Sequence, residues 1–397
     1  MKRVYTITVL TCVIILLALV SCFRIMNLSG HKNNVKVGFI YDNDESTPYT
    51  YNFSLAKDEL EKKYGSRVEI MTCSNVLDDE MEEPLRELVA KGCDIIFLNG
   101  YSEIVRELAP EYPNVQFCQT SYMDMSDQVV PENYHTFKGE AYQGRFVSGV
   151  AAGVKIRQMI LEGTISEEEA VVGFVAAFPT PEVISGYTAF LMGVRSVVSQ
   201  AVMRVSYTQT WSSYALEKSA AKKMIDEGCV IISQYTDTIG PAIACEEASA
   251  EKEVYFVGFN QSMSEVAPGT SLVTSRICWE PYVLAAVEAV MKNESIEKTV
   301  SGNVHGTDVS AGFEKGWVEM DDLNQQVAAP GTQDAMDREI EKFRNGNKDF
   351  VFKGNYTGVS PTDPSDTYDL RKGFIENANT SYPTFHYVIS DIITIDK

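Results

Sequence analysis

Short apolar runs alternate along the chain with stretches whose apolar residues recur at the spacing of a helix. Val35 to Tyr41 is such a run, and a helical pattern over residues 53–64 follows before Val68 to Met71 returns to the strand pattern. The strands predicted in this way cover residues 35–41, 68–71, 94–98, 115–118, 171–175, 202–207, 229–233, 254–259 and 272–277. Regular alternation of strands and helices predicts an α/β protein whose parallel sheets carry helices on both faces.

The two series of strands are separated by a helix of small residues, Gly144 to Val154. The 397 residues of the chain also exceed the ~100–200 residues of a usual domain. We therefore expect two doubly wound lobes with a central cleft. The first lobe is predicted to contain residues 35–155 and about 278–325, and the second residues 156–277. Residues 326–397 are expected to pack on the lobes as a C-terminal segment.

The first residues have the pattern of a bacterial lipoprotein signal. Lys2 and Arg3 give a positive start, Val4 to Val20 is almost wholly apolar, and small residues stand directly before Cys22. The thiol of Cys22 is the group to which a diacylglycerol would be attached. An uncleaved transmembrane anchor is the alternative, but the apolar run falls short of the ~20 residues that span a bilayer comfortably.

We therefore expect residues 1–21 to be a signal peptide that is removed. Lipidated Cys22 would then anchor the protein to the cell membrane on its extracytoplasmic face, with residues 22–34 as a linker. An exported location permits disulfides among the six remaining cysteines, but a body of this size does not need them to build a core. Buried, unpaired thiols are the favoured interpretation of Cys73, Cys93, Cys118, Cys229, Cys245 and Cys278.

The charge and the motif content narrow the classes of function. A formal net charge of -21 argues against nucleic acid as a partner. The sequence contains none of the patterns GxxxxGK[ST], GxGxxG, GxSxG and HExxH, and its four histidines are far apart. We therefore expect a binding protein that is not an enzyme, with no catalytic residues, no cofactor and no metal site.

Aromatic, amide and carboxylate residues follow several of the predicted strands. Ligands of open α/β sheets bind at the carboxyl ends of strands, so these residues are candidates for a ligand site. An aromatic residue from each lobe could hold a planar ring, while Asp237 and Asn260 form hydrogen bonds with its polar edge or with sugar hydroxyls. Taken singly, each aromatic is more readily explained as packing its own loop. The candidates are Tyr49, Asn52, Asn99, Phe178, Glu182, Trp211, Asp237 and Asn260.

Several blocks of sequence, in the same order, resemble one known family. They are Gly144-Arg-Phe-Val-Ser-Gly-Val-Ala-Ala-Gly153, Val172-Gly-Phe-Val-Ala-Ala-Phe-Pro-Thr-Pro-Glu-Val183, and Glu217 to Gly228 followed by Gln234-Tyr-Thr-Asp237. From about Val35 onward the chain is similar to the basic membrane protein (BMP) family of ABC-transporter substrate-binding lipoproteins, which includes purine-nucleoside receptors. The resemblance implies a type I periplasmic-binding fold with a cleft that closes on a ligand.

The resemblance also assigns roles to individual positions. Tyr49 occupies the place of an aromatic residue, usually Trp, that lies against the base, and Phe178 matches the aromatic segment of the opposing lobe. Asp237 matches a polar residue at a strand end, and Asn260 stands where an aspartate is common. Trp279 aligns with a tryptophan near the hinge and joins the candidate ligand-binding residues.

Two departures from the family leave the ligand open. The loop from Asp42 to Pro48 lacks the glycine-rich run of the closest subgroup, and the amide of Asn260 would hold a ribose less tightly than a carboxylate. The expected function is a monomeric receptor that delivers a purine nucleoside or a related flat heterocycle to an ABC permease. A free nucleobase or a flavin-type vitamin is an alternative ligand. Sensing of a ligand, with signalling to a membrane partner, is an alternative role.

Overall fold

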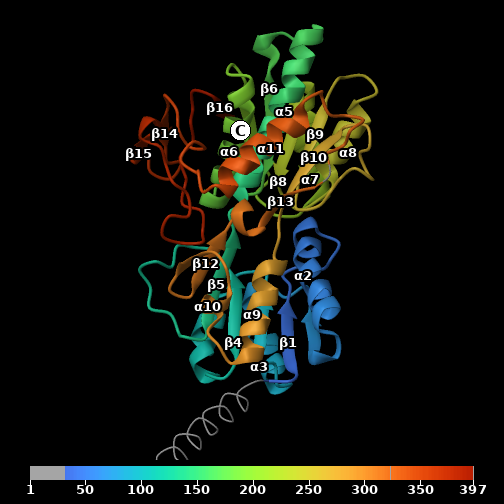
Figure 1. Cartoon of the computed structure of the whole chain (residues 1–397). Coiled ribbons are helices and arrows are strands. Elements are labelled where there is room, and N and C mark those ends of the chain that lie inside the picture. Colours follow the sequence, from blue (N-terminus) through green and yellow to red (C-terminus); the bar gives the residue numbers. More distant parts are fainter. Residues whose placement is uncertain (1–31, 322, 397) are drawn as a thin grey trace, which may run out of the picture.

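The computed structural model describes residues 32–321 and 323–396. The predicted signal peptide, Cys22 and the linker as far as residue 31 lie outside these residues. Within the described ranges the chain forms two lobes, each built on a seven-stranded sheet (Figure 1). The predicted α/β class with two doubly wound lobes is confirmed.

The sheet of lobe 1 has the strand order β11-β12-β5-β4-β3-β1-β2, and its strands are parallel except for the edge strand β11. Helices cover both faces, so the inner strands are buried on both sides; β3 reads as a continuous apolar run, whereas β4 and β5 also carry buried polar residues. The strands are β1 (Val35–Ile40), β2 (Val68–Cys73), β3 (Ile95–Leu98), β4 (Gln116–Thr120), β5 (Tyr134–Gly139), β11 (Asn303–His305) and β12 (Asp308–Ala311). The helices of this lobe are α2 (Pro48–Tyr64), α3 (Glu82–Ala90), α4 (Glu103–Leu108), α9 (Glu280–Lys292) and α10 (Ile296–Thr299).

The sheet of lobe 2 has the order β13-β10-β9-β8-β6-β7-β16, and only β13 runs antiparallel to its neighbour among the described strands. The strands are β6 (Val171–Ala176), β7 (Val202–Tyr207), β8 (Ile231–Tyr235), β9 (Tyr255–Phe259), β10 (Ser271–Ile277), β13 (Val318–Met320) and β16 (Ile393–Ile395). The helices are α5 (Ala141–Glu162), α6 (Pro181–Val197), α7 (Tyr214–Asp226), α8 (Gly240–Ala248) and α11 (Thr332–Arg344).

Small residues allow α5 and α6 to cross at very short range. A Cβ atom added at Gly149 would lie 2.0 Å from the carbonyl oxygen of Phe190, and one added at Gly193 would lie 2.1 Å from that of Phe146. Both distances are far below van der Waals contact. The glycines that stand out in the sequence therefore permit the helix pair to pack backbone against backbone.

The observed lobe boundaries differ from the predicted ones. The first lobe was expected to continue to residue 155, but α5 packs on α6 and β10, so the chain enters lobe 2 near Glu140. The segment 278–325 was expected to lie in lobe 1; α9, α10, β11 and β12 do so, but β13 pairs with β10 in the sheet of lobe 2. The boundaries were misplaced because sequence periodicity does not reveal which sheet a helix or an edge strand joins. The chain therefore crosses between the lobes after β5, after β10 and after β12.

The C-terminal segment is built into lobe 2. Helix α11 packs on α5, a small antiparallel pair follows with β14 (Thr357–Val359) and β15 (Thr367–Asp369), and β16 completes the edge of the sheet beside β7. The predicted unpaired thiols are present, since the six cysteines of the described residues are free and all but the half-buried Cys73 are buried. No helix within the described ranges is long and apolar enough to cross a membrane.

Candidate ligand site between the lobes

A partly open cavity lies between the two lobes, at the carboxyl ends of the inner strands. Its volume is about 40 Å³, which is room for roughly three water molecules. Residues of both lobes form its wall, as expected for a cleft at the strand ends of facing α/β sheets. The lining residues are Asp42, Tyr49, Asn99, Tyr122, Lys138, Glu182, Trp211, Tyr235, Asp237, Phe259, Asn260 and Ile277.

Asn99 organises the wall of lobe 1. Its side-chain oxygen accepts a hydrogen bond from the backbone N–H of Asp42 at 2.9 Å, and its Nδ2 group donates to Thr50 Oγ1 at 3.2 Å. Its backbone carbonyl accepts from the hydroxyl of Tyr49 at 3.0 Å. Asn99 therefore fixes the loop after β1 and the first turn of α2. Both polar atoms of its side-chain amide are used in these hydrogen bonds. The residues that it positions, Asp42 and Tyr49, line the cavity.

Glu182 connects the walls of the two lobes. It stands in the first turn of α6, where Thr180 caps the helix by accepting from the backbone N–H of Val183 at 3.5 Å. One carboxylate oxygen accepts from the hydroxyl of Tyr235 at 2.9 Å, and the other lies 2.9 Å from the Nζ atom of Lys138 in lobe 1. The closed cleft is thus bridged by a buried ion pair.

Lys138 approaches the cavity from β5 and is almost fully buried. Its Nζ atom donates to the backbone carbonyl of Ser121 at 3.0 Å and lies 5.7 Å from the ring centroids of both Tyr122 and Tyr382. A buried ammonium needs such partners, because an unpaired charge away from water is costly. The pairing with Glu182 therefore matters both for stability and for holding the lobes together.

Asp237 is the exception among the charged groups of the cleft. Its backbone N–H donates to the carbonyl of Trp211 at 2.8 Å, but no described residue donates a hydrogen bond to its carboxylate. Burial, reinforced by the negative charges of Asp42, Glu217 and Glu182, raises the pKa of the Asp237 carboxyl well above its usual value. Burial also raises the pKa of Asp42. The cavity therefore offers a strong acceptor that the protein itself leaves without a donor.

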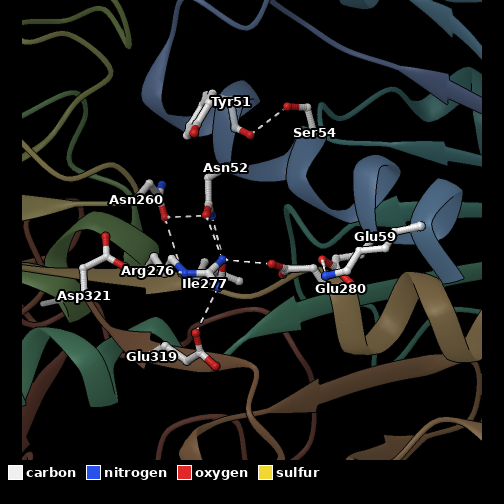
Figure 2. Close-up of polar contacts among 11 residues, drawn as sticks. Tyr51, Asn52, Ser54, Glu59, Asn260, Arg276, Ile277, Glu280, Glu319 and Asp321 are labelled. Carbon is white, nitrogen blue, oxygen red and sulfur yellow. Dashed lines mark hydrogen bonds and ion pairs between the residues drawn. The ribbon is translucent and has the colours of Figure 1, made fainter.

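Asn260 joins the cavity to the hinge (Figure 2). It follows β9 with a left-handed φ of 65°, and its backbone N–H donates to the carbonyl of Ser275 at 2.8 Å. Its side-chain oxygen is 3.5 Å from both the backbone N–H of Ile277 and the Nδ2 group of Asn52. Asn52 Nδ2 in turn donates to the carbonyl of Ile277 at 2.6 Å. With its oxygen taken up, Asn260 retains an Nδ2 donor that makes no hydrogen bond to a described residue.

An arginine beside this junction ties together the segments that cross between the lobes. Arg276, near the end of β10, lies 3.1 Å from a carboxylate oxygen of Glu280 in α9 and 2.9 Å from one of Glu319 in β13. Its NH1 group also donates to Asn52 Oδ1 at 3.4 Å. Figure 2 shows the carboxylates converging on the guanidinium from separate elements. The hinge is therefore a charged, hydrogen-bonded junction rather than a flexible linker.

Six of the nine predicted ligand-binding residues line the cavity, namely Tyr49, Asn99, Glu182, Trp211, Asp237 and Asn260. Asn52 lies one layer behind the wall, at the hinge. Phe178 was predicted in the wall but packs edge-on against Trp211, with ring centroids 5.6 Å apart. Trp279 was also predicted there, but it is buried in the core against Phe53 at 5.1 Å. Aromatic residues bury large areas wherever they stand, and these two serve packing.

Sequence reasoning did not select half of the observed lining. Asp42 and Tyr235 obey the same strand-end rule as the residues that were selected and could have been found by it. Lys138 had no such signal, because β5 was not among the predicted strands. The lining residues that were missed are Asp42, Tyr122, Lys138, Tyr235, Phe259 and Ile277. Within residues 32–321 and 323–396, no group of three or more His, Cys, Asp or Glu side chains is placed to hold a metal ion.

Two lobes joined by three crossings, with a polar and aromatic cleft between them, define a bilobed solute-binding protein. The chain belongs to the Bmp family, described as ABC transporter substrate-binding protein PnrA-like, whose model matches residues 35–348. The predicted family is thereby confirmed, and the protein is an ABC transporter substrate-binding protein. The family is one of solute-binding proteins and not of enzymes.

The chain is 26% identical over 279 residues to a purine-binding protein of Brucella abortus, which covers 69% of this chain and 74% of the relative. It is 28% identical over 218 residues to a Haloferax volcanii protein named as an ABC transporter glucose-binding protein, covering 54% of this chain and 50% of the relative. A solved solute-binding protein of an ABC transporter system from Aeropyrum pernix has a TM-score of 0.64 at 16% identity, covering 79% of this chain and 92% of that one. This last likeness shows the periplasmic-binding-protein fold.

Proposed function

We propose that this protein captures a purine nucleoside or a related flat heterocycle between its lobes and delivers it to an ABC permease. The observation that carries the proposal is the unpartnered carboxylate of Asp237 in a cleft lined by aromatic rings. A related chain is named a purine-binding protein, which agrees with this chemistry.

The cleft matches the groups of a nucleoside or nucleobase. Tyr49 from lobe 1 and Trp211 from lobe 2 both supply aromatic surface to the wall of the cavity, which suits a planar ring. Asp237 accepts hydrogen bonds, and the Nδ2 group of Asn260 donates one. A purine edge or a sugar carries both donors and acceptors, so it satisfies both groups at once. The Asp237 carboxylate is partly buried and has no donor among the described residues, so a ligand with donors at this point is favoured.

The volume of the cleft requires a conformational change for entry. At about 40 Å³ the cavity is far smaller than a purine nucleoside, so the lobes open to admit the ligand and close around it less tightly than they do here. Binding then shifts the equilibrium between open and closed lobes, and a permease distinguishes the two forms by their shape.

The location belongs to the same proposal. The lipobox predicts that Cys22 anchors a monomeric protein to the extracytoplasmic face of the cell membrane, where a permease is within reach of the linker. Replacing Cys22 by Ala is expected to release the protein from the membrane fraction. Mass spectrometry of the wild-type N-terminal peptide is expected to show a lipid-modified Cys22, and an unmodified residue 22 in the membrane fraction contradicts the anchor.

A thermal-shift screen tests the ligand. Adenosine, guanosine, inosine, free purine bases, riboflavin and glucose are each added to purified protein at high concentration. A true ligand at 100 times its dissociation constant adds about 2.7 kcal/mol of stability. Mass spectrometry of small molecules released from natively purified protein identifies a ligand that the screen omits. A shift with glucose alone, or no shift with any nucleoside, base or flavin, refutes the proposed ligand class.

Variants locate the site. Tyr49→Ala and Asp237→Ala are each expected to weaken binding at least tenfold, because one removes an aromatic face and the other the unpartnered acceptor. Tyr214→Ala and Asp391→Ala are the matched controls, since both side chains are exposed and neither lines the cavity. Normal affinity in both cleft variants, measured by isothermal titration calorimetry, places the ligand elsewhere.

A further inference from the structure

A segment of the C-terminal region extends from lobe 2 to lobe 1 and back (Figure 1). It runs from Glu376 to Phe385 and is called the strap below. Before it, Phe352 bridges to Phe374 in the core, and after it β16 joins β7 in the sheet of lobe 2. The strap lies beyond residue 348, where the match to the family model ends. It is therefore a feature of this chain that the family match does not describe.

The tip of the strap is bonded to lobe 1. The carboxylate of Asp308 in β12 accepts hydrogen bonds from the backbone N–H of Ser381 at 2.6 Å, from the hydroxyl of Ser381, and from Thr380 Oγ1 at 3.2 Å. It also accepts from Thr136 Oγ1 within lobe 1 at 2.7 Å. Thr380 and Ser381 are buried, so water does not compete for these bonds. Asp308 therefore holds the tip of the strap against lobe 1.

The base of the strap is bonded to lobe 2. The buried carboxylate of Glu376 accepts from the hydroxyl of Ser185 in α6 at 2.7 Å, and from the backbone N–H groups of Thr384 at 2.5 Å and Phe385 at 3.1 Å. Within the strap, the Nδ2 group of Asn377 donates to the carbonyl of Ser381 at 2.7 Å. These bonds make the strap a stiff loop that transmits the position of lobe 2 to Asp308.

The strap also contacts the charged bridge of the cleft. The ring of Tyr382 lies 5.7 Å from Lys138 Nζ, and the hydroxyl of Ser381 is bonded to that of Ser121. The carbonyl of Ser121 accepts from Lys138 Nζ, which pairs with Glu182 across the cleft. Strap, lysine and ion pair therefore form one continuous set of contacts that spans the two lobes.

We propose that the strap is a positioning element of the ligand cleft: by gripping Asp308 and packing on Lys138 it favours the closed arrangement of the lobes. Loss of one anchoring hydroxyl shifts the ligand-free protein toward the open form, a consequence that does not depend on which ligand is bound. The same loss speeds ligand release, a consequence that rests on the proposed function.

Single hydroxyl deletions at the two ends test the proposal with little risk to folding. Ser381→Ala removes the hydroxyl that bonds to Asp308 and to Ser121 at the lobe 1 end, and Ser185→Ala removes the single bond to Glu376 at the lobe 2 end. Ser365→Ala is the matched control, because its hydroxyl donates at 2.6 Å to Asp363, within the tail. Small-angle X-ray scattering of ligand-free protein measures opening, and hydrogen exchange follows protection of residues 134–139 and 376–385. Circular dichroism verifies that each variant is folded.

We expect each end variant to raise the open-to-closed ratio at least about fivefold, the effect of one hydrogen bond of middling strength. The radius of gyration then increases, protection falls in both segments, and the control matches the wild type. Unchanged scattering and exchange in both end variants overturns the positioning role even if a nucleoside binds normally. Opening of both variants without any nucleoside binding supports the strap and rejects the proposed ligand instead. If Ser381→Ala does not fold, Ser185→Ala at the opposite end decides the question.

Discussion

Replacement of Asp237 by Asn separates the stability of the cleft from its affinity for ligand. The carboxylate has no hydrogen-bond donor among the described residues and faces the negative charges of Asp42, Glu182 and Glu217. Asp237 is only partly buried, so leaving its carboxylate without a donor costs an amount at the low end of the about 1–3 kcal/mol of a fully buried group. The neutral amide of the variant is of nearly the same size and avoids the repulsion. We therefore expect the ligand-free variant to be about 1–2 kcal/mol more stable than the wild type at neutral pH.

The pH dependence of this difference has a definite sign. The raised pKa of Asp237 means that the folded protein keeps a proton that the unfolded chain releases near pH 3.9. Ionisation at higher pH therefore destabilises the folded wild type, while the variant has nothing to ionise at this position. Its advantage in free energy of unfolding should be small near pH 4, should grow as the pH rises above that value, and should level off above the folded pKa of Asp237. Burial also raises the pKa values of Asp42 and Glu217, but both residues are present in both proteins, so their titration largely cancels from the difference.

The assay is calorimetric unfolding of both proteins at several pH values, after bound ligand has been removed by unfolding and refolding. A gain of 1 kcal/mol corresponds to a rise in Tm of about 2–4 °C for a cooperative unit of 150–250 residues. Nucleoside affinity of the same variant should fall at least tenfold, because a hydrogen bond to a charged acceptor is replaced by a weaker one. A variant that is less stable than the wild type at neutral pH, or equally stable at every pH, contradicts the assignment of Asp237 as an unpartnered carboxylate.

Two further substitutions test the packing and the bridge. Gly149→Ala should lower the free energy of unfolding in urea by about 3 kcal/mol or more, because the added Cβ would lie 2.0 Å from a backbone oxygen. The control Gly163→Asn, at an open left-handed position, should change stability little. Equal effects of the two substitutions would refute the close crossing of the helices. Lys138→Met should cost about 3 kcal/mol by leaving Glu182 buried without its cation, and adding Glu182→Gln should restore part of the loss. If the double variant is no more stable than Lys138→Met alone, the ion pair does not account for the loss.

The sequence by itself determined the fold class and much of the wall of the cleft. Strand and helix periods are local properties, so the apolar run at Val35 and the helix after Pro48 could be identified without the rest of the chain. The rule that ligands meet the carboxyl ends of parallel strands then led to Tyr49, Trp211 and Asp237. The family blocks added the cleft that closes on a ligand, and the glycine at position 149 in the first block allows α5 to pack closely on α6.

Only the tertiary structure decided which of these residues face the ligand and which lobe each segment joins. Trp279 and Asp237 carry similar sequence signals, yet one fills the core and the other borders the cavity, because packing against distant elements sets the direction of a side chain. Lys138 and the strap from Glu376 to Phe385 gain their roles from partners more than forty residues away, such as Glu182 and Asp308. Local sequence patterns do not predict such long-range pairs. The ion pair between Lys138 and Glu182 could therefore be identified only from the tertiary structure.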